Sequence, residues 1–252
     1  MRIVFFGNNR AASKVLTWLS RQNEEIVGIV LHPPEKQKYA VEMLSLVDPG
    51  KTKVFYGPSL ADPGTEARIK ELRPDIGISV YFDYILKPGL IGIFPRGLIN
   101  LHPGFLPYNR GQYPNVWSII DGTPAGVALH YLDASIDTGD IIARREVPVE
   151  PIDTGRSLYR KLEKASVSLF RETWPSIRSG GAERSPQDPA GGTCHRTADV
   201  QSIDRIELDA TYPARYLIDV IRARTFPPYE GAYFMYQGRK VFLELKLEYD
   251  NG

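Results

Sequence analysis

Short apolar runs alternate with amphipathic segments through the first half of the chain, and this alternation constrains the fold most strongly. The first run, residues 3–6, ends at Gly7, as a buried parallel strand that feeds a turn does. In the segment that follows, apolar residues recur at the helical spacings of three and four: Ala12, Val15, Leu16 and Leu19. We therefore predict an α/β fold built on a mostly parallel, Rossmann-like sheet.

The same alternation continues to about residue 149. Strands are predicted at residues 2–6, 25–30, 53–56, 75–81, 97–101, 126–132 and 141–149. Helices are predicted at residues 36–47, 65–72, 114–120 and 154–179, with a short one after Pro88. The long helix has four candidate core residues: Leu158, Leu162, Val167 and Phe170.

The composition changes after Gly180-Gly181. Gly, Pro, Ser, Gln and Asp dominate to about residue 197, which predicts an irregular connector. A helix at 214–224 and a hairpin with strands at 232–236 and 240–247 are expected beyond it. We expect a catalytic domain over residues 1–181 and a smaller C-terminal subdomain over residues 182–252.

Charge and cysteine content exclude several classes of protein. The chain carries 31 basic and 30 acidic residues, for a net charge of +1, which gives no electrostatic reason to expect nucleic acid as a partner. One cysteine cannot form a disulfide framework, and the first residues lack the pattern of a secretory signal. No apolar stretch is long enough to span a bilayer. We expect a cytoplasmic protein that does not insert into membranes.

Three polar residues near predicted strand ends are candidates for a catalytic role. Asn100 and His102 are one residue apart, so on a strand their side chains project to the same face. Asp137 lies in the connection between two later strands. An amide, an imidazole and a carboxylate are the groups used in acyl transfer, where attack on a carbonyl generates a negative oxygen and a positive nucleophile, so that the site needs a hydrogen-bond donor and a proton acceptor. Taken singly, each of these residues also fits a turn or capping role.

The three residue types fit that chemistry. The amide of Asn100 can donate to the oxygen without ionising. His102 either takes the proton of the nucleophile or, if protonated first, holds the oxygen; the sequence does not choose between the two schemes. Asp137 would orient the imidazole and relay a proton through water toward the leaving group.

Three segments together resemble the signature of a known enzyme family. They are Asn-Leu-His-Pro-Gly-Phe-Leu-Pro at residues 100–107, Arg110-Gly111, and Asp-Thr-Gly-Asp at residues 137–140. They are similar to the formyltransferases that use N10-formyltetrahydrofolate. Residues 108–117 and 225–234 most resemble members that formylate the amino group of a nucleotide-linked deoxyamino sugar.

This resemblance implies a function and a set of partners. The formyl donor would be N10-formyltetrahydrofolate, no metal would be needed, and Asn100, His102 and Asp137 would form the catalytic set. The acceptor would be a nucleotide-linked dideoxyamino sugar, of the kind used in lipopolysaccharide or O-antigen biosynthesis. In related sugar enzymes the C-terminal hairpin helps to form a homodimer, so a homodimer is expected here.

The resemblance also suggests residues that bind the donor. In the family, the loop after the strand at 75–81 holds the pterin ring, which makes Tyr84, Ile85 and Leu86 candidates, together with Asp137. For each of the first three, simple core packing at a strand end is an equal alternative.

Candidates for binding the acceptor lie in three places. Asn9 and Arg10 follow the first strand and would contact the phosphate or sugar, although Asn9 also fits a helix N-cap. Arg110 would either bind substrate or brace its loop. Phe226 and Tyr229 would either stack on the nucleobase or wedge the hairpin onto the preceding helix.

Two further features receive no functional role at this stage. His130 lies in the middle of a predicted strand and is expected to be a packed or half-exposed strand residue rather than a catalyst. Cys194-His195 lacks the second spaced pair that a zinc site requires. Two alternative functions stay open, a methionyl-tRNA formyltransferase-like enzyme and a catalytically silent binding protein for folate or nucleotide sugars. A tRNA enzyme would be expected to carry a further C-terminal domain and a basic surface.

Overall fold

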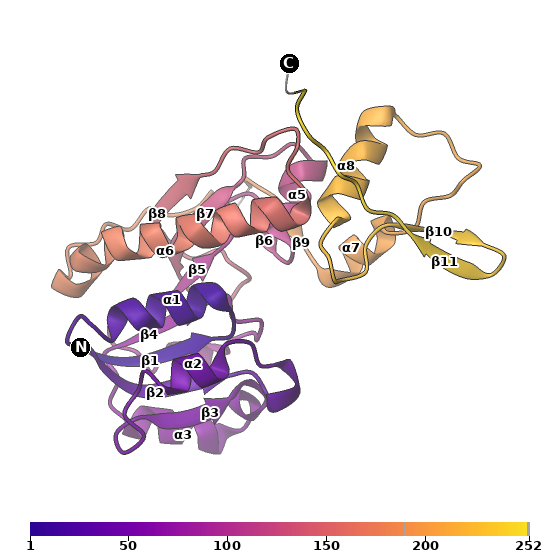
Figure 1. The fold of residues 1–252 in the computed structure, drawn as a ribbon. Coiled ribbons are helices and arrows are strands. Elements are labelled where there is room, and N and C mark those ends of the chain that lie inside the picture. The colour runs from indigo at the N-terminus through magenta and orange to yellow at the C-terminus, as the bar shows by residue number, and fades with distance from the viewer. Residues whose placement is uncertain (189, 251–252) are drawn as a thin grey trace. The chain divides into compact units, whose positions relative to one another are not determined.

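The structure contains a seven-stranded mixed sheet (Figure 1). The computed structural model describes residues 1–188 and 190–250. The strand order is β3-β2-β1-β4-β5-β7-β8, in which β1 to β5 pair in parallel and β7 pairs antiparallel with β5. The strands are β1 (Arg2–Gly7), β2 (Glu25–Leu31), β3 (Lys53–Tyr56), β4 (Ile76–Val80), β5 (Leu98–His102), β7 (Gly126–Tyr131) and β8 (Ile141–Glu146). The predicted α/β class with a mostly parallel sheet is confirmed.

Helices connect these strands and continue beyond them. They are α1 (Arg10–Leu19), α2 (Ala40–Leu44), α3 (Pro63–Glu71), α4 (Pro88–Ile91), α5 (Pro114–Ile120), α6 (Gly155–Ser179), α7 (Thr197–Ile203) and α8 (Ala214–Arg224), with 3-10 turns at Pro34–Lys36 and Gly57–Ala61. The smaller strands are β6 (Arg110–Gly111), which pairs in parallel with β9 (Cys194–His195), and the hairpin of β10 (Tyr233–Tyr236) and β11 (Arg239–Phe242).

One helical prediction was wrong in extent, and one helix was missed. The helix expected at 36–47 is broken into a 3-10 turn and α2, because Tyr39 has a left-handed backbone with φ of 59° and the N–H of Lys38 donates to Asn8 Oδ1 instead of continuing a helix. Helix α7 was not predicted. It begins where the Asp199 carboxylate accepts the N–H of Arg196 at 2.6 Å, a local bond that the polar composition of the segment obscured.

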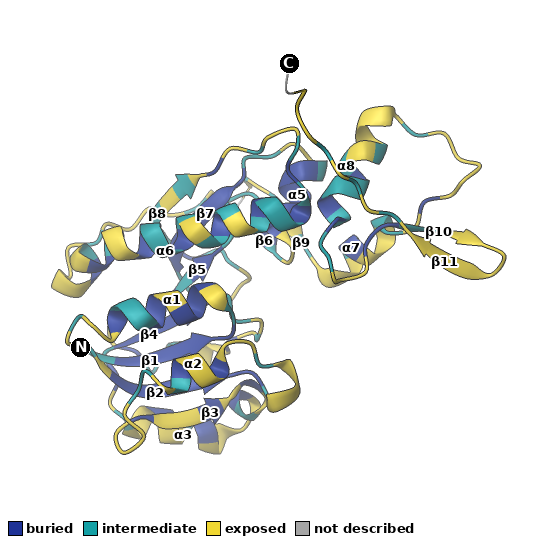
Figure 2. Ribbon diagram, viewed as in Figure 1, coloured by how far each residue is buried: buried dark blue, intermediate teal, exposed yellow. Residues whose placement is uncertain are grey.

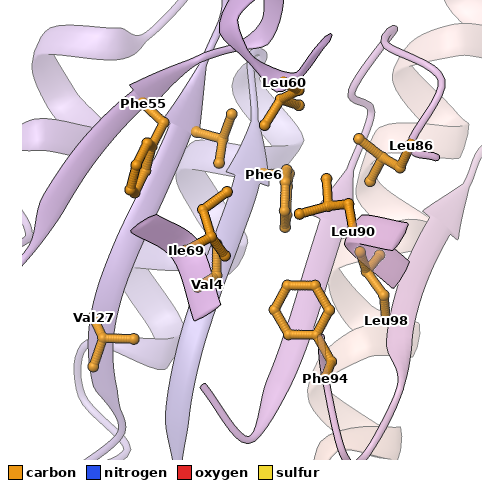
Figure 3. Packing of buried hydrophobic residues seen from close by; sticks show 11 residues of the cluster. Val4, Phe6, Val27, Phe55, Leu60, Ile69, Leu86, Leu90, Phe94 and Leu98 are labelled. Atoms are coloured by element: carbon orange, nitrogen blue, oxygen red, sulfur yellow. The ribbon is translucent and has the colours of Figure 1, made fainter. Parts of the chain in front are cut away.

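Burial of β1 on both faces of the sheet explains its continuous apolar run in the sequence. Residues 3–6 of β1 have no exposed surface, and β1 is dark blue along most of its length in Figure 2. In Figure 3, Phe6 of β1 lies beside Leu90 of α4, and Val4 of β1 lies beside Ile69 of α3. A strand packed on both faces has no polar side to alternate with, and its sequence is therefore continuously apolar.

The chain divides into two compact units whose segments alternate along the sequence. Unit 1 contains residues 1–102, 128–144 and 166–187, and unit 2 contains residues 103–127, 145–165 and 188–252. The expected domain limits, 1–181 and 182–252, stay a prediction. No helix among the described residues is long and apolar enough to cross a membrane.

Candidate active site

Strand β5 delivers the first two polar side chains of the site. Asn100 and His102 lie in the second half of the strand and alternate with Leu101, which is fully buried. On the antiparallel neighbour β7, Asn100 lies opposite His130 and His102 lies opposite Ala128. The period of two along a strand therefore places both polar side chains on one face, as the sequence predicted.

The loop between β7 and β8 brings in Asp137. The N–H of Tyr131 donates to the carbonyl of Asp140 at 2.9 Å, which closes the loop at its base. A Cβ on Gly139 would lie 2.0 Å from the Tyr131 carbonyl oxygen, so only glycine permits this approach. Asp137 itself has a left-handed backbone with φ of 52°. The closed loop and the left-handed backbone of Asp137 direct its side chain back toward β5.

The Asp137 carboxylate divides its two oxygens between different partners. Its Oδ1 lies 3.4 Å from Asn100 Nδ2, and its Oδ2 lies 3.5 Å from His102 Nδ1. His102 is 4% exposed, and the Asp137 side chain is 12% exposed. Because Asp137 faces Nδ1, Nε2 is the ring nitrogen of His102 on the side away from the carboxylate. Asp137 thus contacts both of the other side chains named from the sequence, Asn100 and His102.

His130 is a fourth member of this cluster, which sequence reasoning missed. Its side chain is fully buried, one of the two environments expected, and Nε2 lies 3.2 Å from Asn100 Nδ2 and 3.4 Å from Asp137 Oδ1. Nδ1 lies 2.9 Å from the Tyr131 carbonyl oxygen, which can only accept, so Nδ1 carries a proton. In the neutral ring Nε2 then accepts from the Asn100 amide. The antiparallel β5–β7 pairing creates this contact, and the sequence did not predict that pairing.

The loop after β4 holds the three side chains expected to line a folate pocket, in three different environments. Leu86 is 7% exposed and belongs to the hydrophobic core. The Tyr84 ring packs on Phe82, with centroids 5.3 Å apart, and on the buried His32 at 5.1 Å. Ile85 is 81% exposed. The packing of Tyr84 and Leu86 therefore anchors the loop to the rest of unit 1, whereas the side chain of Ile85 is exposed at the surface.

Asn9 and Arg10 lie at the start of α1 in unit 1. Asn9 is the N-cap of the helix, because its Oδ1 accepts the N–H of Ala12 at 3.1 Å. Arg10 is the first residue of the helix and is exposed. The preceding Asn8 is buried and bonds Lys36 and Lys38 through its side chain, which ties the loop after β2 to this turn.

The other acceptor candidates belong to unit 2. Arg110 is 8% exposed, and its Nη2 donates to the Asp188 carbonyl at 3.4 Å, a bracing contact. The rings of Phe226 and Tyr229 meet edge to face with centroids 5.6 Å apart, and Phe226 also contacts Tyr159 at 5.5 Å. Tyr229 is exposed.

His195 has an aromatic partner. Its ring stacks on Trp117 with centroids 4.1 Å apart, and Nε2 lies 3.4 Å from Asp121 Oδ2. Burial lowers the pKa of His195 and raises the pKa of Asp121, so both groups are shifted toward their neutral forms. Within the part of the chain that the structure describes, no group of three His, Cys, Asp or Glu residues is placed to hold a metal ion.

Family models match most of the chain. Residues 1–173 match the model described as formyl transferase, and residues 199–249 match the model described as the N-formyltransferase dimerization C-terminal domain. The chain belongs to the formyl transferase family, and its activity is the transfer of a formyl group. The family resemblance stated from the sequence is therefore confirmed.

Two curated relatives represent different members of the family. A dTDP-4-amino-4,6-dideoxyglucose formyltransferase from Mycobacterium tuberculosis is 37% identical over 175 residues, which cover 66% of this chain and 74% of the relative. A methionyl-tRNA formyltransferase from Geotalea daltonii is 30% identical over 247 residues, which cover 96% of this chain and 78% of the relative.

Two solved structures are similar to this one. A 4-N formyltransferase from Francisella tularensis superimposes with a TM-score of 0.84 and 28% identity, covering 99% of this chain and 98% of the other. A formyltransferase from Anoxybacillus kamchatkensis, in complex with UDP-4,6-dideoxy-4-formamido-L-AltNAc and tetrahydrofolate, has a TM-score of 0.58 and 30% identity, covering 80% of this chain and 89% of the other.

Proposed function

We propose that this chain transfers the formyl group of N10-formyltetrahydrofolate to the amino group of a nucleotide-linked dideoxyamino sugar. The observation that carries the proposal is the contact of Asp137 with both Asn100 and His102 at the end of β5, at distances of 3.4 and 3.5 Å. The relatives from M. tuberculosis and F. tularensis, whose names specify amino-sugar and 4-N formyl transfer, support this choice of acceptor.

Asn100 is assigned to the oxyanion. One of its two amide N–H groups is held by His130, with Nδ2 3.2 Å from the ring nitrogen, which fixes the plane of the amide. The second N–H faces Asp137 across a long contact of 3.4 Å and is shared with the oxygen as negative charge develops there. Such a donor needs no ionisation and lies ready before the reaction begins.

His102 and Asp137 are assigned to proton transfer. The carboxylate beside Nδ1 orients the imidazole so that Nε2 faces the incoming amine. In one scheme Nε2 takes the proton of the amine; in the other, the ring is already protonated and stabilises the oxygen. In both schemes Asp137 favours the charged imidazole and relays the proton lost by the amine, through water, to the folate nitrogen, which departs as its bond to the formyl carbon breaks.

Binding roles follow the positions of the remaining candidates. Tyr84, Ile85 and Leu86 are assigned to the folate, with Asp137 at the reacting end; Tyr84 and Leu86 shape the loop, and the exposed Ile85 offers an apolar contact. Five residues are assigned to the sugar nucleotide: Asn9, Arg10, Arg110, Phe226 and Tyr229. Among them, Arg10 is an exposed cation suited to the phosphates, and Tyr229 is an exposed ring suited to the base.

A homodimer in the cytoplasm completes the proposal. Residues 199–249 match a dimerization domain, and the hairpin within it exposes several large apolar side chains: Met235, Tyr236, Val241 and Phe242. Apolar side chains gathered on so small an element favour contact with a second copy.

A methionyl-tRNA acceptor is the second candidate, because the relative from Geotalea daltonii covers nearly the whole chain. The net charge of +1 disfavours it, since a tRNA-binding surface is normally rich in Lys and Arg. A catalytically silent binding protein is disfavoured because binding alone does not require a carboxylate in contact with both an amide and an imidazole.

The test is a direct assay of acceptor choice. The protein is mixed with N10-formyltetrahydrofolate and a panel of nucleotide-linked 3-amino and 4-amino deoxysugars, and formyl gain is followed by mass spectrometry. Transfer to one of these sugars, abolished by His102→Ala, is expected. Transfer to initiator methionyl-tRNA alone would replace the sugar with tRNA as acceptor, and binding of a sugar nucleotide without any transfer would favour the silent protein.

A further inference from the structure

The side chain of Gln187 bonds the backbone on both sides of Thr138. Its Nε2 donates to the carbonyl of Asp137 at 2.9 Å and to the carbonyl of Gly139 at 2.7 Å. A carboxamide nitrogen carries two N–H groups, so one amide satisfies both carbonyls. Both distances are in the range of well-formed hydrogen bonds. The bonds link Gln187 to a loop 50 residues earlier in the chain.

Backbone pairing sets the position of Gln187. Ser185 forms an antiparallel bridge with Ile141, in which each N–H donates to the other carbonyl, at 2.8 and 2.9 Å. In an antiparallel register a step forward on one segment is a step back on the other, and Gln187 therefore falls opposite Gly139. The Ile141–Ser185 bridge thus places the side chain of Gln187 within hydrogen-bonding distance of the loop.

Asp137 needs such support to keep its conformation. A left-handed backbone, here with φ of 52°, costs free energy for any residue with a side chain and persists where its surroundings impose it. The contacts of the carboxylate with Asn100 and His102 are 3.4 and 3.5 Å long, at the weak end of the hydrogen-bond range. The two Gln187 bonds are shorter, and they act directly on the strained backbone.

We infer that Gln187 is a positioning residue of the formyl-transfer site, which fixes the backbone of the loop so that the Asp137 carboxylate faces His102. The inference rests on the proposed function, in which Asp137 orients the imidazole. The inference gives a structural role to the connector after α6, for which the composition predicted only an irregular segment.

Two substitutions separate hydrogen bonding from packing. Gln187→Met keeps the length of the side chain and removes both donors, and Gln187→Ala removes the side chain as well. Glu183→Ala, at an exposed residue of the same connector, is the matched control. We expect kcat to fall about 10- to 100-fold in both Gln187 variants, since displacement of a catalytic group by about 1 Å costs this much. KM for the acceptor sugar should stay unchanged, as should kcat of the control.

An NMR measurement on the ligand-free protein tests the inference without any activity. The NMR signals of the Asp137 and Thr138 backbone amides and of the His102 ring should change their chemical shifts in Gln187→Met. The same signals should keep their wild-type chemical shifts in Glu183→Ala. If the wild-type protein formylates no acceptor, the proposed function fails while these signals still report on the loop. Wild-type kcat in Gln187→Met would overturn the inference, and so would a loss of kcat with unshifted loop signals.

Discussion

At the scale of single residues, the side chains of the site constrain one another. Asp137 Oδ1 lies 3.4 Å from both Asn100 Nδ2 and His130 Nε2, and Asp137 Oδ2 lies 3.5 Å from His102 Nδ1. The His130 ring is in turn bonded to the Tyr131 carbonyl. Removal of one member therefore disturbs the orientation of the others. Groups arranged in this way act as a unit, and the effects of their mutations do not add.

Asn100→Ala should lower kcat about 100- to 1,000-fold, the usual cost of a lost oxyanion donor. The double variant Asn100→Ala/His102→Ala should be barely slower than His102→Ala alone, because the remaining group no longer has a partner to work with. Steady-state kinetics of the two single variants and the double variant measure this. Independent, multiplicative losses would show that the two residues do not act together.

His32 supports the loop after β4 and should make stability depend on pH. Burial lowers the pKa of His32 below its usual 6.5, and Lys36 and Lys38 lower it further, while Asp83 opposes them. No hydrogen-bond partner for Nε2 exists among the described residues. Below pH 6.5 the unfolded chain thus binds a proton that the folded chain does not, and stability falls as pH drops from there toward the folded pKa.

His32→Phe should reduce this pH dependence, since the substituted ring cannot be protonated. Chemical denaturation at about pH 7.5 and about pH 5.5, on either side of the usual histidine pKa, compares the two proteins. We expect the wild type to lose more stability than His32→Phe between these pH values, with a residual loss in the variant from His195, whose pKa burial also lowers. Equal losses in both proteins would remove His32 as a source of the effect.

At the scale of elements, α6 is held by its buried face. Leu158, Leu162 and Phe170 have no exposed surface, as predicted, whereas Val167 is only partly buried. The buried residue at that level is Ser166, whose hydroxyl lies 3.0 Å from the Tyr81 hydroxyl. A polar pair at a helical core position cannot be recognised from apolar periodicity, since that pattern counts only apolar residues.

Leu162→Ala should destabilise the protein by about 2 to 5 kcal/mol, because truncation of a fully buried leucine loses transfer free energy and leaves a cavity. Lys164→Ala, at an exposed position of the same helix, should change stability by less than about 0.5 kcal/mol. The midpoints of urea denaturation at constant m-value measure both. A Leu162→Ala protein as stable as the control would show that packing of this face of α6 contributes little to the stability of the protein.

The parallel strands and the shared face of Asn100 and His102 could be predicted, because both depend on periodicity within a few residues. The contact of His130 depends on an antiparallel pairing of β5 with β7, and the position of Asp137 depends on a left-handed backbone bonded by Gln187. These are long-range properties that no local pattern encodes. The resemblance pointed to Asn100, His102 and Asp137 without supplying these contacts.

At the scale of the whole molecule, the polar cluster and the hairpin fall in different units. Asn100, His102, Asp137 and Gln187 all lie in unit 1, whereas β10 and β11 lie in unit 2. Strand β11 is exposed along its whole length (Figure 2). A two-stranded hairpin is only marginally stable without a packed face, so a partner surface is expected to cover one side of it.

The register of the hairpin separates its two faces. Tyr233 and Phe242 are paired on one face, where the Lys240 ammonium lies 4.4 Å from the centre of the Tyr233 ring and 6.0 Å from that of Phe242. Phe234 pairs with Val241 on the opposite face, which also carries Tyr236. Since the chain's own lysine covers part of the first face, the second face is the better candidate for contact with another copy.

Tyr236→Glu should therefore dissociate the proposed homodimer, because the 59% exposed ring would be replaced by a carboxylate that loses its hydration in an apolar interface. Phe242→Glu, on the lysine-covered face of the same hairpin, is the matched control and should remain dimeric. Size-exclusion chromatography with light scattering gives the mass of each. A monomeric Phe242→Glu beside a dimeric Tyr236→Glu would assign the interface to the other face, and two dimeric variants would place it outside the hairpin.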